Sequence, residues 1–279
     1  MSRIKAFLSC KNQYNLNYNK QIKHNFASPD AEKGTATHYI AENYSDHKDY
    51  TFNDWVEKLK VHEHFGKKLD LSSISMEDLE MGFENIKVFW KDFVEKFYSK
   101  EEIFKEDKIE FLIDNETFQG TLDLTLKNSN FPEDGQKTKY TILDYKSTKS
   151  GGSGAEHALQ LSTYVMAAHK KYEPQMSLKD FSKITKVAVY YPYTNFKSST
   201  LENLKIVNLE YSDIDESKDT LLNAISAIEE EKNWLSTVHF GCRWCGYAGS
   251  GWCPSSRVKG YMKTRGTKFF KSGIEISDS

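Results

Sequence analysis

The residues best suited to metal-assisted chemistry lie on two apolar stretches in the middle of the chain. Asp144 and Lys146 end the stretch YTILDYK (140 to 146), where the period of a β-strand places both side chains on one face. Asp123 lies within FQGTLDLTL (118 to 126), where an unpaired buried carboxylate is costly. Carboxylates bind magnesium or manganese, and a neighbouring lysine can orient a water molecule. An Asp-x-Lys triplet alone is equally typical of a surface ion pair, so the case for a site depends on all three residues.

The four cysteines form a second group. Three lie in the pattern Cys242-x2-Cys245-x7-Cys253, and the fourth is Cys10. A C-x2-C step brings two thiolates to one metal, and a third thiolate from the same loop nearly completes a tetrahedral shell. Structural zinc sites typically use two C-x2-C steps, and only one is present, which favours an iron-sulfur cluster over zinc. Four unrelated buried thiols are the remaining alternative.

The hydrophobic pattern predicts a mixed β-sheet flanked by helices. Strands are expected at 108 to 114, 118 to 126, 140 to 146, 184 to 193 and 204 to 211. Helices are expected at 31 to 45, 155 to 172 and 213 to 235, with a helical block at 51 to 105. Asp114-Asn115 suits a hairpin turn. Because strands and helices do not alternate regularly, the fold class expected is α/β or α+β with a mixed sheet.

The order of these residues resembles the RecB-like branch of the PD-(D/E)XK nucleases. That branch includes the nuclease domains of RecB and AddB and the CRISPR-associated exonucleases that carry an iron-sulfur cluster. The resemblance extends from near residue 5 to residue 254, with no motif between 45 and 105. The matching motifs are Gly34-x3-His38-x3-Glu42, then Glu110, Gly120-x2-Asp123, Ile142-Leu-Asp144-Tyr-Lys146 and Gln160-x3-Tyr164.

The resemblance implies a restriction-endonuclease-like core and a role for each matched residue. It makes His38, Asp123, Asp144 and the backbone carbonyl of Tyr145 the ligands of a magnesium or manganese ion. Lys146 would position or deprotonate the attacking water.

Four further residues take supporting roles in the same resemblance. Gln160 and Tyr164, four apart on one helix face, would support the site and contact the DNA backbone. Glu110 would be an outer-shell or second-metal residue. Glu42 would orient the imidazole one turn before it as a hydrogen-bond acceptor.

The resemblance also assigns the cysteines. Cys10 would join Cys242, Cys245 and Cys253 in holding a [4Fe-4S] cluster that fastens the two ends of the chain together. The x7 spacing is slightly longer than the family leads us to expect, which keeps zinc open as the alternative.

One nuclease domain is expected to span residues 1 to 279. Its parts would be a helical insertion at 46 to 106, a nuclease core at 107 to 212, a C-terminal helix and cluster segment at 213 to 256, and a basic tail at 257 to 279. From Arg257 through Lys271 the charged residues are all basic. This tail is either a solvated end or a segment that contacts phosphates.

Composition limits the function classes. The formal net charge is only -2, so an overall basic charge does not argue for a nucleic-acid partner. No stretch resembles a signal peptide or a membrane span, so a cytoplasmic protein is expected. The sequence indicates no oligomeric state.

The leading interpretation is a metal-dependent DNA nuclease, an exonuclease on single- or double-stranded DNA ends in recombination, repair or phage DNA metabolism. No Walker motif is present, so a helicase or recombination partner would be a separate chain. The alternatives are a DNA- or protein-binding module that does not cut, and a zinc-stapled structural protein.

Overall fold

The computed structural model describes most of the chain. The described residues are 2–22, 29–64, 67–127, 138–148, 157–194 and 200–237, with Cys242, Cys245, Tyr247 and Cys253. They fall into two compact units, one from residues 29–218 and the other from residues 1–28 and 219–279. The expected basic tail at 257 to 279 lies outside the described residues, and the single-domain organisation stays a prediction.

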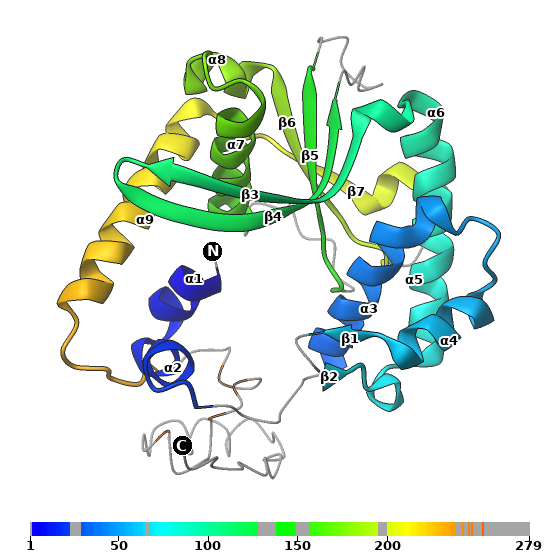
Figure 1. The fold of residues 1–279 in the computed structure, drawn as a ribbon, viewed down its shortest axis with the longest axis horizontal. Helices are drawn as coiled ribbons and strands as arrows, with labels where there is room; N and C mark the ends of the chain where they lie inside the picture. Colours follow the sequence, from blue (N-terminus) through cyan, green and yellow to red (C-terminus); the bar gives the residue numbers. More distant parts are fainter. Residues whose placement is uncertain are drawn as a thin grey trace. The chain divides into compact units, whose positions relative to one another are not determined.

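A five-stranded mixed sheet forms the centre of the larger unit (Figure 1). Its strands are β3 (Ile103–Ile113), β4 (Glu116–Lys127), β5 (Tyr140–Tyr145), β6 (Thr185–Tyr190) and β7 (Leu204–Val207). They pair in that order, and β5 with β6 is parallel while the other pairs are antiparallel. The predicted fold class, a mixed sheet with flanking helices, is confirmed.

The turn between β3 and β4 is the predicted Asp114-Asn115 hairpin. Asp114 has a φ of 53°, the left-handed conformation that two-residue hairpin turns require and that aspartate tolerates well. On the approach to the turn, Ile109, Phe111 and Ile113 are buried while the residues between them are exposed. This alternation fixes which residue of β3 lies opposite which residue of β4.

Helices cover both faces of the sheet, with α7 and α8 on one side and α3 and α5 on the other in Figure 1. The helices of the larger unit are α3 (Pro29–Asn43), α4 (Phe52–Val61), α5 (Met76–Phe89), α6 (Glu95–Phe97), α7 (Ala158–Tyr172) and α8 (Leu178–Lys183). Short helical turns are η2 (Tyr44–Asp46), η3 (Leu71–Ser73), η4 (Trp90–Val94), η5 (Lys100–Glu102) and η7 (Thr200–Asn203). The two-residue strands β1 (Glu63–His64) and β2 (Lys67–Lys68) pair with each other.

The main core lies between the sheet and helices α3, α4 and α5, of which the last two belong to the segment predicted to be helical, 51 to 105. Ala36 and Ile40 of α3 and Phe89 of α5 pack in one cluster with Leu143 and Tyr145 of β5. Burying a large apolar side chain contributes about 1.5–3 kcal/mol relative to leaving it exposed. The other face of the sheet is covered by α7, which contacts β3, β5 and β6. Helices α3 and α7, which lie on opposite faces of the sheet, are thereby held against the strands that carry the carboxylates.

The smaller unit joins the N-terminal helices to the segment after the last helix. Its elements are α1 (Ser2–Ser9), α2 (Lys11–Tyr14), the π-helical turn η1 (Asn15–Asn19) and the second part of α9 (Tyr211–Glu230). Tyr14 stacks on Trp234 with ring centroids 5.7 Å apart, and the backbone N–H of Asn12 donates to the carbonyl of Leu235 at 3.2 Å. These contacts place Cys10 beside residues 234 to 237.

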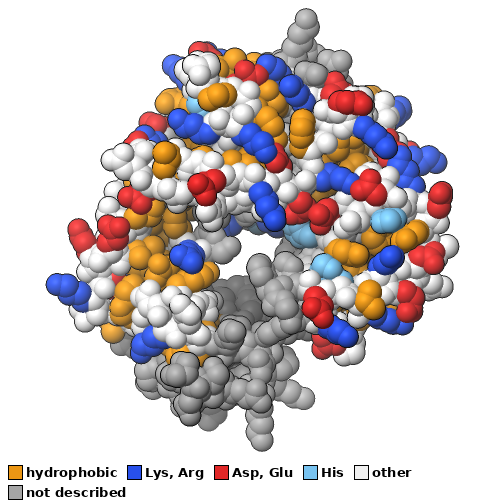
Figure 2. All heavy atoms as spheres, viewed as in Figure 1, with side chains coloured by type: hydrophobic (Ala, Val, Ile, Leu, Met, Phe, Trp, Pro, Cys, Tyr) orange, Lys and Arg blue, Asp and Glu red, His pale blue; other side chains and the backbone are white. Residues whose placement is uncertain are grey.

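Charge is mixed over the face of the molecule that Figure 2 draws. Figure 2 shows Lys and Arg side chains interspersed with Asp and Glu over the visible face, in line with the formal net charge of -2. Among the described helices, none is long and apolar enough to cross a membrane.

Candidate active site

Three neighbouring strands align three carboxylates. The register of β3 with β4, continued across the interruption at Glu106, brings Glu106 level with Asp123, and the register of β4 with β5, continued one residue beyond its last pair, brings Asp144 level with Asp123. Side chains directly opposite on antiparallel strands share a face, with Cβ atoms about 4.5–5.5 Å apart. The sheet therefore gathers three acidic groups at one level.

Glu106 has an unusual backbone. Its φ is 44°, and the regular pairing of β3 with β4 is interrupted at this residue. A left-handed conformation costs a residue with a Cβ atom about 1–2 kcal/mol. Strain of this kind concentrates at functional sites, so the conformation supports a role for Glu106.

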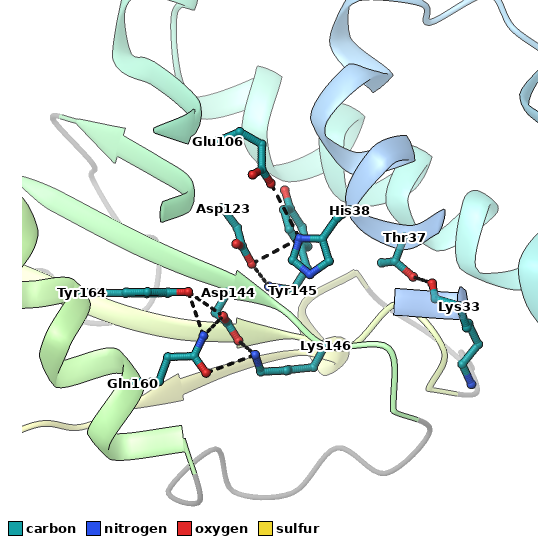
Figure 3. Close-up of polar contacts among 10 residues, drawn as sticks. All are labelled: Lys33, Thr37, His38, Glu106, Asp123, Asp144, Tyr145, Lys146, Gln160 and Tyr164. Atoms are coloured by element: carbon teal, nitrogen blue, oxygen red, sulfur yellow. Dashed lines mark hydrogen bonds and ion pairs between the residues drawn. The ribbon is translucent and has the colours of Figure 1, made fainter. Parts of the chain in front are cut away.

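Helix α3 brings His38 to the carboxylates (Figure 3). Its Nδ1 lies 3.6 Å from Oε1 of Glu106 and 3.7 Å from Oδ2 of Asp123. One ligand atom from each of these three residues lies within 4.8 Å of the others. The backbone N–H of Tyr145 donates to Oδ2 of Asp123 at 2.8 Å and fixes that carboxylate. An imidazole and two carboxylates so arranged suit a divalent metal ion.

The electrostatics of this cluster also favour a cation. Burial alone would lower the pKa of His38, but its contacts with Glu106 and Asp123 raise that pKa to about 9. Burial raises the pKa of Asp123 to about 7, opposed by the charge of His38 and reinforced by the charge of Asp144. Excess negative charge in a buried place is relieved by a proton or by a metal ion.

A second network links Asp144 to helix α7. The ammonium group of Lys146 forms an ion pair with Oδ2 of Asp144 and donates to Oε1 of Gln160 at 3.4 Å. The amide of Gln160 donates to Oδ1 of Asp144 at 2.8 Å and to the hydroxyl of Tyr164 at 2.7 Å. That hydroxyl donates in turn to Oδ1 of Asp144 at 3.4 Å. Each of these side chains is held by at least two contacts.

Most of the residues singled out from the sequence therefore lie together. His38, Asp123, Asp144, Lys146, Gln160 and Tyr164 surround one place at the end of β5, as Figure 3 shows, with Tyr145 between the strands and the main core. Glu42 lies one turn beyond His38 on α3, and burial together with the charge of Glu106 raises its pKa.

The structure does not place Glu110 with this group. Its side chain is exposed and accepts a hydrogen bond from Gln119 at 2.6 Å on the hairpin. The acidic residue opposite Asp123 is Glu106, which sequence reasoning missed. Counting back from the two-residue turn Asp114-Asn115 would have found it, because such a turn fixes the register of the whole hairpin.

Three of the four cysteine sulfurs contact the dipeptide Ser236-Thr237 of the smaller unit. The backbone N–H of Thr237 donates to Sγ of Cys10 at 3.5 Å, and Sγ of Cys242 lies 3.8 Å from the carbonyl of Thr237. The hydroxyl of Ser236 lies 3.5 Å from Sγ of Cys253.

The fourth cysteine, Cys245, belongs to the same buried neighbourhood. It packs against a small core that contains Leu16, Cys242, Tyr247 and Cys253. The N-terminal cysteine and the three C-terminal ones are thus gathered in one unit.

Adjacent strands of the mixed sheet bring two aspartates and a lysine to one face, and a histidine and a glutamate lie beside them. This combination is typical of a metal-dependent phosphodiester hydrolase. The chain matches the PD-(D/E)XK nuclease superfamily over residues 1–254 and belongs to that superfamily. Its members are nucleases that use magnesium- or manganese-type ions, and the fold implies DNA as the substrate. No curated protein matches the chain significantly.

Proposed function

We propose that the chain is a metal-dependent DNA exonuclease of the RecB-like branch that acts on DNA ends in recombination, repair or phage DNA metabolism. The observation that carries the proposal is the fixed position of Lys146 between Asp144 and Gln160, beside the cluster of His38 and Asp123. A surface ion pair would need no such set of contacts.

The metal ligands proposed are His38, Asp123, Asp144 and the backbone carbonyl of Tyr145. When bound, a magnesium or manganese ion polarises the phosphate and neutralises charge at the leaving oxygen. The Tyr145 N–H holds Oδ2 of Asp123 in place before any ion arrives, and the Gln160 amide does the same for Oδ1 of Asp144. Two carboxylates held in this way lose little rotamer freedom when the ion binds.

Lys146 is the residue proposed to act on the attacking water. Its Nζ is fixed by the carboxylate of Asp144 and by the amide oxygen of Gln160, so its remaining N–H group points to a defined place. There the N–H orients the water by donating to its oxygen, and a Lys146 that has first lost this proton, leaving a lone pair at the same place, would accept the proton of the water. Tyr164 keeps Gln160 in position through the 2.7 Å hydrogen bond between them, and both residues are proposed to contact the DNA backbone.

We also propose that Cys10, Cys242, Cys245 and Cys253 hold a [4Fe-4S] cluster, with zinc as the alternative. Three sulfurs share contacts with Ser236 and Thr237, which supports a common site. Bound metal would fasten the first helices to the C-terminal segment. Iron, sulfide and zinc analysis of protein purified without oxygen tests this: four irons per chain support the cluster, and one zinc per chain rejects it.

The nuclease proposal is tested with end-labelled single- and double-stranded DNA in manganese, magnesium or EDTA. Lys146→Ala is the test variant. Lys170→Ala is the matched control, because it removes an exposed lysine of α7 outside the site. We expect cleavage that needs a metal ion, is lost in Lys146→Ala and is kept in Lys170→Ala, with the label pattern giving the polarity.

Two outcomes would contradict the proposal. Cleavage by Lys146→Ala at the wild-type rate would show that the centre is wrongly assigned. No cleavage by folded wild-type protein that still binds DNA would favour a binding module.

A further inference from the structure

Strand β3 changes the side of the sheet that its residues face at Glu106. In a regular strand, residues three apart point to opposite faces. Phe104 and Asp107 nevertheless both contact Tyr172 of α7: the ring centroids of Phe104 and Tyr172 lie 5.6 Å apart, and the Tyr172 hydroxyl donates to the Asp107 carboxylate. The left-handed backbone of Glu106, with a φ of 44°, accounts for the change. As a result, Lys105 and Asp107, on either side of Glu106, reach opposite faces of the sheet.

Lys105 is fixed to the end of helix α3, on the side of the sheet opposite α7. Its ammonium group donates to Oγ of Ser45 at 2.8 Å and to Oδ2 of Asp46 at 2.7 Å. Both acceptors lie in the turn η2, which follows directly on α3. The lysine side chain is only 23% exposed, and its ammonium group lies 6.0 Å from the ring centroid of Trp90. Three contacts therefore fix the chain directly before Glu106.

Asp107 is fixed on the other side of the sheet. Its carboxylate accepts from the ammonium group of Lys171 and from the hydroxyl of Tyr172, which are neighbours in α7. Glu106 therefore lies between one anchor on the helix that carries His38 and another anchor on the helix across the sheet. A strained backbone conformation persists only where its surroundings impose it, and two anchors on opposite faces supply that constraint.

We propose that Lys105 is a positioning residue, which together with Asp107 imposes the left-handed conformation of Glu106 and so holds its carboxylate beside His38 for a divalent metal ion. The inference rests on the proposed nuclease function, because it assigns Glu106 to the metal centre of that enzyme. Oε1 of Glu106 lies 3.6 Å from Nδ1 of His38 in this conformation. Lys105 acts through the backbone of its neighbour and not by contact with the ion.

The sign of the effect separates positioning from charge. An ammonium group near a cation site repels the ion, so its removal would tighten metal binding if charge alone mattered. Loss of the anchor instead lets Glu106 relax to an ordinary extended backbone, which turns its carboxylate away from His38 and weakens metal binding. The two explanations therefore predict opposite changes in the affinity for metal.

Manganese binding to the full chain, measured by titration calorimetry without DNA, tests the proposal. Lys105→Met keeps the length of the side chain but removes the ammonium group. We expect it to weaken manganese binding about tenfold, as the loss of an outer partner of a metal ligand does. Ser45→Ala, which removes one acceptor without a change of charge, should weaken binding by a smaller factor. The matched control is Lys139→Met, which removes a lysine paired with Glu173 and should bind manganese as the wild type does.

Double variants show whether Lys105 acts through Glu106. Lys105→Met should weaken manganese binding much less in a Glu106→Gln background than in the wild type, because effects that share one residue are not additive. Glycine adopts the left-handed region readily, so Glu106→Gly should melt about 2–4 °C above Glu106→Ala. That difference should shrink when Lys105→Met is added. A merely structural role of Lys105 would move neither comparison.

Several results would overturn the positioning role. They are manganese binding by Lys105→Met as tight as in the wild type or tighter, an equal loss in Lys139→Met, and a full further loss in the Glu106→Gln background. None of these measurements needs cleavage, so the two proposals fail separately. Cleavage that depends on Lys146, with manganese binding unaltered by Lys105→Met, would reject the positioning role alone. Manganese binding that depends on Lys105 in a protein that cuts no DNA would reject the nuclease function alone.

Discussion

Glu106 and Asp123, on neighbouring strands, place their carboxylates beside the same nitrogen of His38: Nδ1 lies 3.6 Å from Oε1 of Glu106 and 3.7 Å from Oδ2 of Asp123. Two carboxylates this close to one imidazole nitrogen form a stable arrangement only when a proton or a metal ion compensates their charge. The strained backbone of Glu106 is the cost of bringing its side chain to that place.

Glu106→Gln should therefore weaken metal binding and cleavage, because it removes one charge from the cluster while preserving the shape of the side chain. We expect a loss of about 10- to 100-fold in manganese affinity, measured by titrating cleavage rate against free manganese. Glu110→Gln is the matched control on the same strand and should stay within about twofold of wild type. Equal losses of manganese affinity in the two variants would show that Glu106 contributes no more to metal binding than Glu110 does.

Metal affinity should rise with pH. The pKa of Asp123 is raised to about 7 and that of His38 to about 9, so both groups hold protons that a metal ion must displace. As pH increases through this range the protons are lost and the competition ends, which strengthens binding. Titration calorimetry between pH 6 and 9, in buffers of different ionisation enthalpy, should show proton release that declines as pH increases. Affinity and proton release that do not change with pH would contradict the assignment.

Tyr164→Phe should slow cleavage about tenfold with little change in stability, because the ring stays packed while the hydroxyl contacts with Gln160 and Asp144 are lost. Gln160→Ala should have a larger effect, since it releases both Asp144 and Lys146. Single-turnover rates at saturating metal measure both. Tyr172→Phe is the control, because it removes a hydroxyl of the same helix that binds Asp107 instead. If the rate fell as much in Tyr172→Phe as in Tyr164→Phe, the hydroxyl of Tyr164 would have no particular role in cleavage.

Strand periodicity accounts for much of what the sequence predicted. A period of two placed Asp144 and Lys146 on one face, and the Asp114-Asn115 turn fixed the hairpin. The start of β3 was missed by five residues, since Glu106 is left-handed and breaks the alternation on which strand prediction depends. Glu110 was proposed from the order of the family's motifs, which does not report the interruption of the strand at Glu106.

Other features depend on contacts that no local pattern reports. The short helix α8 (Leu178–Lys183) is stabilised by its Ser177 cap and by the burial of Phe181, and six residues are too few for a periodic signal. The gathering of Cys10 beside Ser236 and Thr237 depends on aromatic packing around Trp234. A family resemblance suggested that grouping, and hydrophobic periodicity could not.

Two glycine substitutions should have opposite effects on stability. In Gly82→Ala the new Cβ would lie 2.6 Å from Cε1 of Tyr193, a buried ring whose hydroxyl is bonded to Thr37 at 2.9 Å. Overpacking costs about 1–3 kcal/mol, which exceeds the helix propensity gain of about 1 kcal/mol. In Gly34→Ala the nearest atom is 3.4 Å away, so that gain should be retained. Melting temperatures should fall for the first variant and hold or rise for the second; a rise for Gly82→Ala would show that Tyr193 moves freely.

The cysteine group gives the last prediction. Cys10→Ser should lower bound iron and the melting temperature together, because the proposed ligand between the chain ends is lost. Ser236→Ala should leave the iron content unchanged but shift the reduction potential to lower values, by an amount on the order of tens of millivolts, since a hydrogen bond to a cluster sulfur stabilises the reduced state. The Ser236 hydroxyl accepts from Asn12 at 3.0 Å, which leaves its own proton for Sγ of Cys253.

Redox titration followed by visible absorption measures this shift. Ser182→Ala, which removes a hydroxyl of the larger unit bonded to the carbonyl of Lys179, is the control and should leave the potential unchanged. Full iron content and an unaltered melting temperature in Cys10→Ser would exclude Cys10 from the ligands. An unchanged potential in Ser236→Ala would mean that its hydroxyl does not donate to the sulfur in the loaded protein.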